Sequence, residues 1–201
     1  MHVQGLAYDR DEYDFMDEDR DCIVFENNRI YNHPLLRVNY TTYDLRREQD
    51  TVNPLSHADV MVLLQEEERT HPYWYAQVIK IFHVMVQHQK DQYSHFKKPI
   101  RMDVLFMWWF QMDSNYLAGW DVKRLYRLQF FEKDCLADTF GFIDPNLVVR
   151  GVHLIPGFGY GEMNDYLDQS FVRQAGSESN TDWRYFYVNM WVFSLFLYFQ
   201  V

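Results

Sequence analysis

The sequence predicts a mainly β fold with minor α structure, in which several strands curl into a small barrel. Aromatic residues make up 18% of the chain, with 15 Tyr and 16 Phe, and these side chains favour strands because they pack well on a pleated, half-buried surface. Two long apolar segments, Tyr73 to Val84 and Val104 to Phe110, predict neighbouring strands. Only eight Gly and six Pro argue against a disordered linker protein, and a hydrophobic content of 48% is enough for a core.

The chain before residue 65 predicts extended segments separated by turns and one loop. Cys22 to Leu45 has an extended pattern, and Asn27-Asn28 predicts a hairpin turn within it, because Asn tolerates positive φ. Gln49 to Ser56 predicts a loop, since Pro54 disfavours helical geometry in the residue before it. Asp59 to Leu64 fits either a capped helix or a short buried strand. We expect the strand, because the strands that follow need a partner.

The clearest strand prediction covers Tyr73 to Val84. Trp74, Ala76 and Val78 share one face, and the apolar phase shifts beyond residue 80, which predicts a bulge or a strand buried on both faces. Val104 to Phe110 contains seven consecutive apolar residues. This run is too short to span a membrane and is typical of a central strand.

A hairpin is predicted from these two long strands. The polar segment Gln87 to Pro99 would form the loop that joins them. Apolar segments at 60–64 and 125–131 come before and after the pair in the chain. A hairpin with one further strand on each side can curl into a small barrel, which is the architecture that we expect.

The last third of the chain predicts shorter elements. Asp144-Pro145 is a helix-start signal, and we expect Gly151 to end that turn before a strand resumes. Met163 to Gln174 predicts a short helix, and Gly157 to Gly161 predicts a turn before it, because this segment lacks the spacing of a phosphate-binding loop. Tyr185 to Val201 is apolar and uncharged. A buried or misassembled strand is favoured there over an artefactual end or a membrane contact.

The net charge of −10 is unevenly distributed. Asp9 to Asp21 holds eight acidic residues and two Arg, a net charge of −6, which leaves −4 for the remaining residues. We therefore expect an acidic flexible arm over residues 1–21, a single β-rich domain over 22–192 and an atypical apolar tail over 193–201. Cys22 and Cys135 lie far apart and outside any CxxC pattern, and the N-terminus lacks a signal-peptide pattern. Reduced thiols in an intracellular compartment are therefore expected.

The sequence offers no motif to which catalysis can be assigned. It lacks the GxSxG pattern and a Cys/His arrangement, and carboxylates for two-metal cleavage cannot be identified from spacing alone. No pair of histidines has the spacing of a zinc site, so we expect no bound metal. Because catalytic motifs are also missing, we expect no cofactor and no enzymatic activity. The histidines considered are His71, His83, His88, His95 and His153.

Two groups of residues are candidates for ligand binding. Aromatic side chains around a groove can hold a methylated ammonium, although the same residues are typical of a core. The residues of this candidate groove are Trp74, Tyr75, Trp109 and Trp120. Basic residues could instead contact the phosphates of DNA, although such clusters are typical of solvated turns. These basic residues are Lys97, Lys98, Arg101, Lys123 and Arg124.

Four blocks of sequence carry a resemblance to a known family. They are NNRIYNHPLLRVNYTTYDLRREQD, HPYWYAQVIKIFHV, FGFIDPNLVVRGVHLIP and DWRYFYVNMWV. From Cys22 to Val192 the chain resembles the C-terminal part of Plavaka-type transposases, which are CACTA-like elements of mushroom-forming fungi. The nuclease core of that family lies upstream of this part, so the resemblance implies a transposase-derived module without catalytic residues. Trp108 stands where the family usually has Arg, and the last ten residues differ from the usual end.

The order of the strands is also similar to that of a bromo-adjacent homology (BAH) domain. The segments YWYAQVIKIFHV and VLFMWWF match the two long barrel strands of that fold, and FGFIDPNLVVRGVHLI resembles a later segment. This resemblance implies an SH3-like or BAH-like β-barrel with peripheral short helices, used for chromatin or protein contacts.

The function expected from these observations is a non-catalytic accessory module of a transposase that binds protein or chromatin in the nucleus, with no membrane partner. Direct contact with transposon DNA is one alternative, and a basic stripe on one face would favour it. A degenerate transposon relic without present function is the other, and a C-terminal strand that cannot pack would favour it.

Overall fold

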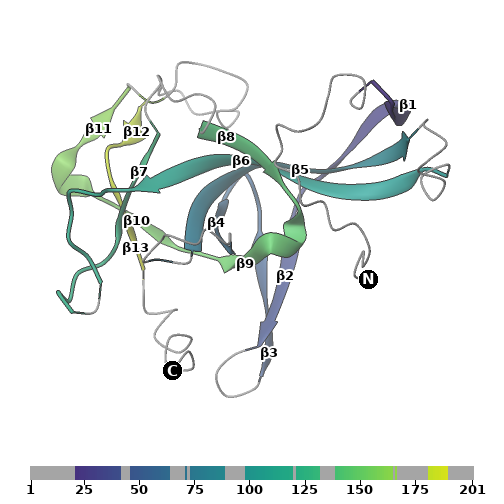
Figure 1. Cartoon of the computed structure of the whole chain (residues 1–201). Helices are drawn as coiled ribbons and strands as arrows, with labels where there is room; N and C mark the ends of the chain where they lie inside the picture. Colours follow the sequence, from purple (N-terminus) through teal and green to yellow (C-terminus); the bar gives the residue numbers. More distant parts are fainter. Residues whose placement is uncertain are drawn as a thin grey trace. The chain divides into compact units, whose positions relative to one another are not determined.

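The computed structural model describes residues 21–41, 46–63, 71, 73–88, 98–119, 121–131, 139–164, 166 and 181–189. These residues form a mainly β structure, which confirms the fold class that the sequence predicts (Figure 1). No helix within them is long and apolar enough to cross a membrane. The predicted acidic arm, apart from Asp21, and the predicted apolar tail lie outside the described residues.

The chain divides into two compact units, and each is described by itself. One unit comprises Met1–Tyr31 and His83–Met102, and the other comprises Asn32–Phe82 and Asp103–Val201. Three strands have residues in both units. They are β1 (Ile23–His33), β5 (Tyr73–His88) and β6 (Ile100–Met112).

In the first unit, β1 pairs with β5. Asn27 and Asn28 have φ values of 55° and 50°, yet β1 runs through them without interruption. The predicted hairpin turn at this dipeptide is therefore wrong. Asn does tolerate positive φ, but here that tolerance serves a strand with irregular backbone and not a reversal of the chain. Tyr31 and His83 stack within the same unit, with ring centroids 4.7 Å apart.

The second unit is built on an antiparallel sheet that curls into a half-barrel (Figure 1). The strand order is β10-β13-β7-β6-β5-β4-β9, and β8 also pairs with β6. The strands not yet given are β4 (Asp59–Leu63), β7 (Arg127–Phe130), β8 (Phe140–Ile143), β9 (Val148–Gly151), β10 (Leu154–Pro156) and β13 (Phe186–Val188). The order β4-β5-β6-β7 confirms that the apolar segments before and after the long strands flank them. The finer SH3-like or BAH-like likeness stays a prediction.

A separate hairpin joins β2 (Leu36–Thr41) to β3 (Arg47–Val52) in full register, from Leu36 opposite Val52 to Thr41 opposite Arg47. The predicted loop over Gln49 to Ser56 is thus wrong for its first half. The turn is confined to residues 53–57, where the amides of Ser56 and His57 both donate to the carbonyl of Asn53. The prediction failed because β3 exposes four of its six residues. Its composition is therefore as polar as that of a loop.

The C-terminal elements follow the predictions in part. Asp144 caps the 3-10 turn η4 (Pro145–Leu147) by accepting a hydrogen bond from the amide of Asn146 at 2.8 Å, as the start signal predicts. Gly151 ends the strand β9 and not the turn itself. A second turn, η5 (Phe158–Tyr160), occupies the glycine-rich segment.

The predicted helix does not begin at Met163, because that residue lies in a strand. Met163 belongs to β11 (Glu162–Met163), which pairs with β12 (Asp182–Trp183), and residues 167–174 lie outside the described ranges. The apolar C-terminal segment forms the strand β13 where it is described, between β7 and β10, with Val188 fully buried and Phe186 and Tyr187 partly exposed. Residues 190–201 lie outside the described residues.

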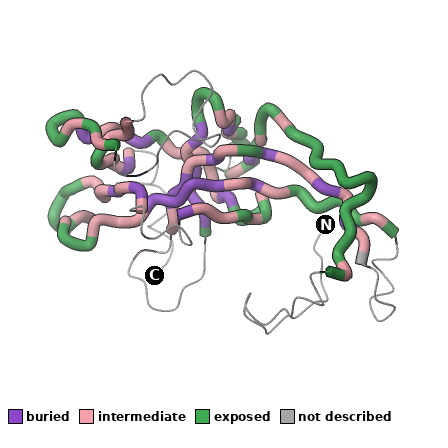
Figure 2. The backbone as a smooth tube through the Cα atoms, turned by 90° about the horizontal axis from the view of Figure 1, so that it is seen from above, coloured by how far each residue is buried: buried purple, intermediate pink, exposed green. Residues whose placement is uncertain are grey.

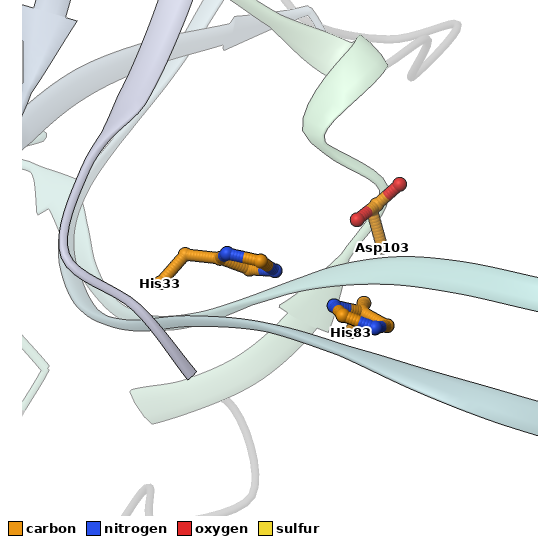
Figure 3. A group of neighbouring side chains, drawn as sticks. All are labelled: His33, His83 and Asp103. Carbon is orange, nitrogen blue, oxygen red and sulfur yellow. The ribbon is translucent and has the colours of Figure 1, made fainter. Parts of the chain in front are cut away.

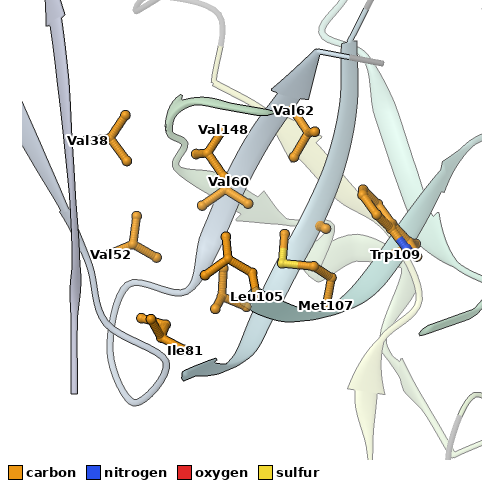
Figure 4. Packing of buried hydrophobic residues seen from close by; sticks show 11 residues of the cluster. Val38, Val52, Val60, Val62, Ile81, Leu105, Met107, Trp109 and Val148 are labelled. Atoms are coloured by element: carbon orange, nitrogen blue, oxygen red, sulfur yellow. The ribbon is translucent and has the colours of Figure 1, made fainter. Parts of the chain in front are cut away.

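Hydrophobic clusters lie on both faces of the sheet, and the buried backbone gathers along the long strands (Figure 2). Leu105, Met107 and Trp109 of β6 belong to a first cluster, whereas Trp108 and Phe110 belong to a second, as alternation along a strand requires. The first cluster is closed by the β2–β3 hairpin and β9 (Figure 4). Its members are Val38, Val52, Val60, Val62, Ala76, Val78, Ile81, Leu105, Met107, Trp109 and Val148.

Strand β5 is also buried on both faces, which confirms the prediction from its shifted phase. Ala76 and Val78 belong to the first cluster and Tyr75 to the second. Ile81 joins the first cluster although three positions separate it from Val78. In a regular strand an odd spacing places two residues on opposite faces, so this spacing agrees with the shift of the apolar phase along the strand.

Candidate functional site

The structure brings together two of the four aromatic residues predicted to form a groove. Trp74 and Trp109 pack edge to face in the first cluster, with ring centroids 5.9 Å apart. Tyr75 points to the opposite face of the sheet, where only 2% of its surface is exposed. Trp120 lies outside the described residues. The three described residues therefore do not line one exposed groove.

Trp109 is held in the core by a glycine on the neighbouring strand. A Cβ atom added to Gly141 of β8 would lie 2.6 Å from Nε1 of Trp109, closer than side-chain atoms approach one another. Trp109 itself is only 8% exposed. This close contact between indole and backbone is typical of packing and leaves no room for a ligand at the ring.

The predicted basic residues are divided between the two units. Lys98 and Arg101 belong to the first unit, Lys123 and Arg124 belong to the second, and all four are exposed. Lys123 has a φ of 52° in a tight turn, closed by two hydrogen bonds between the backbones of Gly119 and Arg124. Lys97 lies outside the described residues.

Side chains that could ligate a metal are divided in the same way. Figure 3 draws His33, His83 and Asp103. His33 and Asp103 belong to the second unit and His83 to the first. The three side chains are therefore split between the units, and no metal site is assigned to them.

An arginine on β7 lies at the centre of a cluster that the sequence did not predict. Arg127 binds Asp113 through Nε at 2.8 Å and through a terminal nitrogen at 2.6 Å. The side chains are only 13% and 7% exposed, respectively. The amide of Asp113 also donates to the carbonyl of Arg127, so backbone and side chains fasten the end of β6 to the start of β7.

Tyrosine rings surround the guanidinium of Arg127. Its central carbon lies 4.1 Å from the ring centroid of Tyr116, 4.3 Å from that of Tyr185 and 5.3 Å from that of Tyr160. It also donates a hydrogen bond to the hydroxyl of Tyr160 at 3.2 Å. We call the following residues the arginine–tyrosine cluster: Asp113, Tyr116, Arg127, Tyr160, Tyr185 and Tyr187.

The fold assembles this cluster from four separate parts of the chain. The pairing of β13 with β7 sets Tyr187 opposite Arg127. The amide of Gly157 donates to the carbonyl of Tyr185 at 2.7 Å, which brings η5 and Tyr160 against the strand. A Cβ on Gly157 would lie 3.0 Å from that carbonyl oxygen, so glycine allows the close approach.

The electrostatics of the cluster keep Arg127 charged. Desolvation alone would lower its pKa, but hydrogen bonds to Asp113 and Tyr187 outweigh it and raise the pKa above the ordinary value. Desolvation raises the pKa of Tyr187, and its hydrogen bond with Tyr160 adds to the effect. The position that a methylated ammonium would take among these rings is therefore filled by the protein's own guanidinium.

Exposed aromatic and basic side chains lie around the cluster. Phe158 is 67% exposed and touches Trp183 edge to face, and Tyr160 is 50% exposed. Arg124 lies over the ring of Tyr116 at 5.8 Å, and Arg184 lies over that of Tyr185 at 5.6 Å. We call Phe158, Tyr160, Arg124 and Arg184 the rim of the cluster.

A second polar network fastens the β2–β3 hairpin to β9. Arg150 lies 3.4 Å from the carboxylate of Asp50, donates to the hydroxyl of Tyr40 at 3.1 Å and covers that ring at 4.4 Å. Tyr40 donates in turn to Glu48. Desolvation, followed by this hydrogen bond, raises the pKa of Tyr40. The network closes the first cluster from outside, which is a structural role.

Two ionisable groups inside the second unit have strongly shifted pKa values. Desolvation raises the pKa of Asp59 at the start of β4 to about 7, although the residue keeps some exposed surface. It lowers the pKa of His71 to about 4. The His71 ring is 3.0 Å from the hydroxyl of Tyr75 through Nε2 and packs on Tyr126 at 4.5 Å. Both residues are partly buried, and both shifts are caused by desolvation.

No pattern in the sequence could have identified the arginine–tyrosine cluster, because its members are spread over residues 113–187 and none forms a motif with another. Comparison with protein-family models, with curated proteins and with solved structures finds no match for this chain. The site must therefore be interpreted from its own chemistry.

Proposed function

We propose that this chain is a non-catalytic accessory module, derived from a transposase, that binds another protein or chromatin through the rim of the arginine–tyrosine cluster. The derivation from a transposase rests on the sequence blocks that resemble that family. The binding role rests on the surface of the second unit.

The exposed ring of Phe158 is the observation that carries the binding role. Phe158 is 67% exposed and lies edge to face on Trp183, and the half-exposed ring of Tyr160 follows two residues later. Exposed patches that combine several apolar rings mark interaction sites on proteins. Tyrosine and arginine next to it are the residue types that contribute most to protein interfaces. The network beneath holds these rings in place, so little side-chain entropy is lost when a partner binds.

The filled centre of the cluster favours a contact across the rim. A methylated lysine would need the space among the rings of Tyr116, Tyr160 and Tyr185, where Arg127 is held by its ion pair with Asp113. The partner is therefore better described as a peptide segment that lies over Phe158 and Tyr160 than as a methylated side chain inserted between rings.

Contact with DNA is the alternative, and the exposed turn at Lys123 and Arg124 is the observation that favours it. Phosphate binding requires several basic residues on one face, and the other predicted members, Lys98 and Arg101, belong to the first unit. The relic hypothesis is less favoured, because β13 packs and Val188 is fully buried.

The test is a titration of the purified full chain against an array of short peptides, from acidic sequences to basic histone tails, and, in parallel, against transposon-end DNA at several salt concentrations. Phe158→Ala is the diagnostic variant. Phe142→Ala is its matched control, since Phe142 is 66% exposed in β8 of the same unit. We expect peptide binding that falls about tenfold in Phe158→Ala and is unchanged in Phe142→Ala.

Two outcomes would contradict the proposal. Peptide binding that is equal in both variants would mean that the rim is not the contact surface. Binding to DNA that weakens steeply with salt, without any peptide binding, would establish the alternative.

A further inference from the structure

We propose that the rim selects partner segments that carry carboxylate groups, which Arg124 and Arg184 contact directly. This inference rests on the proposed binding function and names the chemistry of the partner.

The two arginines make similar contacts with rings of the cluster. Each is exposed, and each lies over a tyrosine ring that also faces Arg127: Arg124 over Tyr116 and Arg184 over Tyr185. A guanidinium that rests on an aromatic ring keeps its edge of N–H donors directed outward. That edge matches the two oxygens of a carboxylate, so both arginines can bind such a ligand while they remain over their rings.

The two rim arginines also differ from Arg127 in how their charge is compensated. The charge of Arg127 is compensated by Asp113. Neither Arg124 nor Arg184 forms an ion pair with a carboxylate among the residues that the structure describes. Asp121 and Lys123 carry opposite charges in the turn that holds Arg124, so that turn keeps one net positive charge.

The surroundings strengthen this selection. Phe158 packs on Trp183, the residue before Arg184, and Tyr160 packs on Tyr185, over which Arg184 lies. Both rings are exposed, and a partner that covers them removes water from this charge. A carboxylate in the partner would compensate it, whereas a basic segment would be repelled. The chain as a whole has a net charge of −10, and Glu162 and Asp182 lie in the strand pair next to Arg184, so binding of an acidic peptide depends on direct contact with the two guanidinium groups.

The experiment measures fluorescence anisotropy of a labelled short peptide of alternating Glu and Gly residues, titrated with the full chain at low salt. The same peptide with Gln in place of Glu tests the need for carboxylates, and oligothymidylate of similar length tests for a phosphate ligand. We expect the Glu peptide to bind, the Gln peptide to bind much more weakly, and the Arg124→Ala/Arg184→Ala double variant to lose about tenfold in affinity.

Arg37→Ala is the matched control, because Arg37 is an exposed arginine of β2 in the same unit. Equal affinity of the double variant and the control would overturn the inference, as would tighter, arginine-dependent binding of oligothymidylate. If array peptides without carboxylates bind in a Phe158-dependent manner while the Glu peptide does not, the proposed function stands and the selection for carboxylates is wrong. If no peptide of either kind depends on Phe158, Arg124 or Arg184, both proposals are wrong.

Discussion

Two aromatic regions of the second unit differ in a way that separates packing from binding. Trp74 and Trp109 pack together in the first cluster, under the β2–β3 hairpin and against a glycine of β8. The rings of the arginine–tyrosine cluster lie at the surface, around a guanidinium, and Tyr160 keeps half of its surface exposed. Indole rings contribute most when water is removed from them, whereas tyrosines can contact a cation and water at the same time.

An apolar run with several aromatic residues is therefore more typical of a buried core than of a ligand site. Trp108 and Trp109 occur within one strand that is buried on both faces, so each ring points into a different cluster. The tyrosines at the surface come from separate loops and strands. Surface sites assembled in this way leave little signal in a single sequence.

The largest effect is expected from Trp109→Ala, which tests whether the first region is core. Removal of a buried indole leaves a cavity and should lower the free energy of unfolding by about 4 kcal/mol. Tyr116→Ala in the surface cluster should cost about 1 kcal/mol, because it removes the contacts of a partly exposed ring with Arg127, Arg124 and Tyr187. Urea denaturation of the two variants measures the difference. Similar losses in both would contradict the distinction between the regions.

Gly141→Ala tests the contact that holds Trp109 in place. The added methyl group would lie 2.6 Å from Nε1 of the indole, so the ring must move, at a cost of about 2 kcal/mol. Gly159→Ala is the control, since a Cβ there meets no atom within 4 Å. Thermal unfolding of the two variants should differ clearly, and an unchanged midpoint in Gly141→Ala would show that the ring is loosely packed.

Arg127→Ala tests the surface region by removing its central cation. The variant loses charge-assisted hydrogen bonds to Asp113 and should be destabilised by about 1.5 kcal/mol. Arg127→Lys should recover only part of this loss, because an ammonium cannot reproduce the planar contacts with the rings. Arg124→Ala, at an exposed site, should change stability by less than about 0.5 kcal/mol. Equal stabilities of the alanine variants by urea denaturation would contradict the central role of Arg127.

A further prediction concerns pH and the interior of the unit. The pKa of Asp59 is raised from its ordinary value near 4 to about 7, so the folded state holds a proton that the unfolded chain has released between these values. Stability contributed by Asp59 is therefore lost as pH rises from about 4 to about 7, by about 1 kcal/mol per pH unit. His71 acts in the opposite direction, because its lowered pKa favours the folded state as pH rises from about 4 towards 6.5.

The variant Asp59→Asn distinguishes the contribution of Asp59 to the pH dependence of stability from that of His71. His71 is present in both proteins, so its effect cancels in the difference between them. The stability of Asp59→Asn relative to the unaltered chain should increase as pH rises from about 4 to about 7, as measured by urea denaturation at each pH. A constant difference over this range would show that the carboxyl of Asp59 is well solvated.

The sequence by itself determined the fold class and the central strands. The apolar runs at 73–84 and 104–110 could be satisfied only by strands buried on both faces, and the segments before and after them supply the flanking strands of the sheet. The cap at Asp144 was also readable, since a side chain that bonds the amide two positions later acts locally. Features of this kind depend on residues that are neighbours in the chain.

Only the tertiary structure decided which polar segments are strands and where the surface cluster lies. The polar strand β3 forms because β2 pairs with it and only Val52 needs to be buried, and Asn27-Asn28 stays within a strand because β5 supports β1. Arg127 meets its tyrosines because β13 pairs with β7 and η5 packs against Tyr185. These outcomes depend on contacts between distant segments, which the pattern along one chain does not contain.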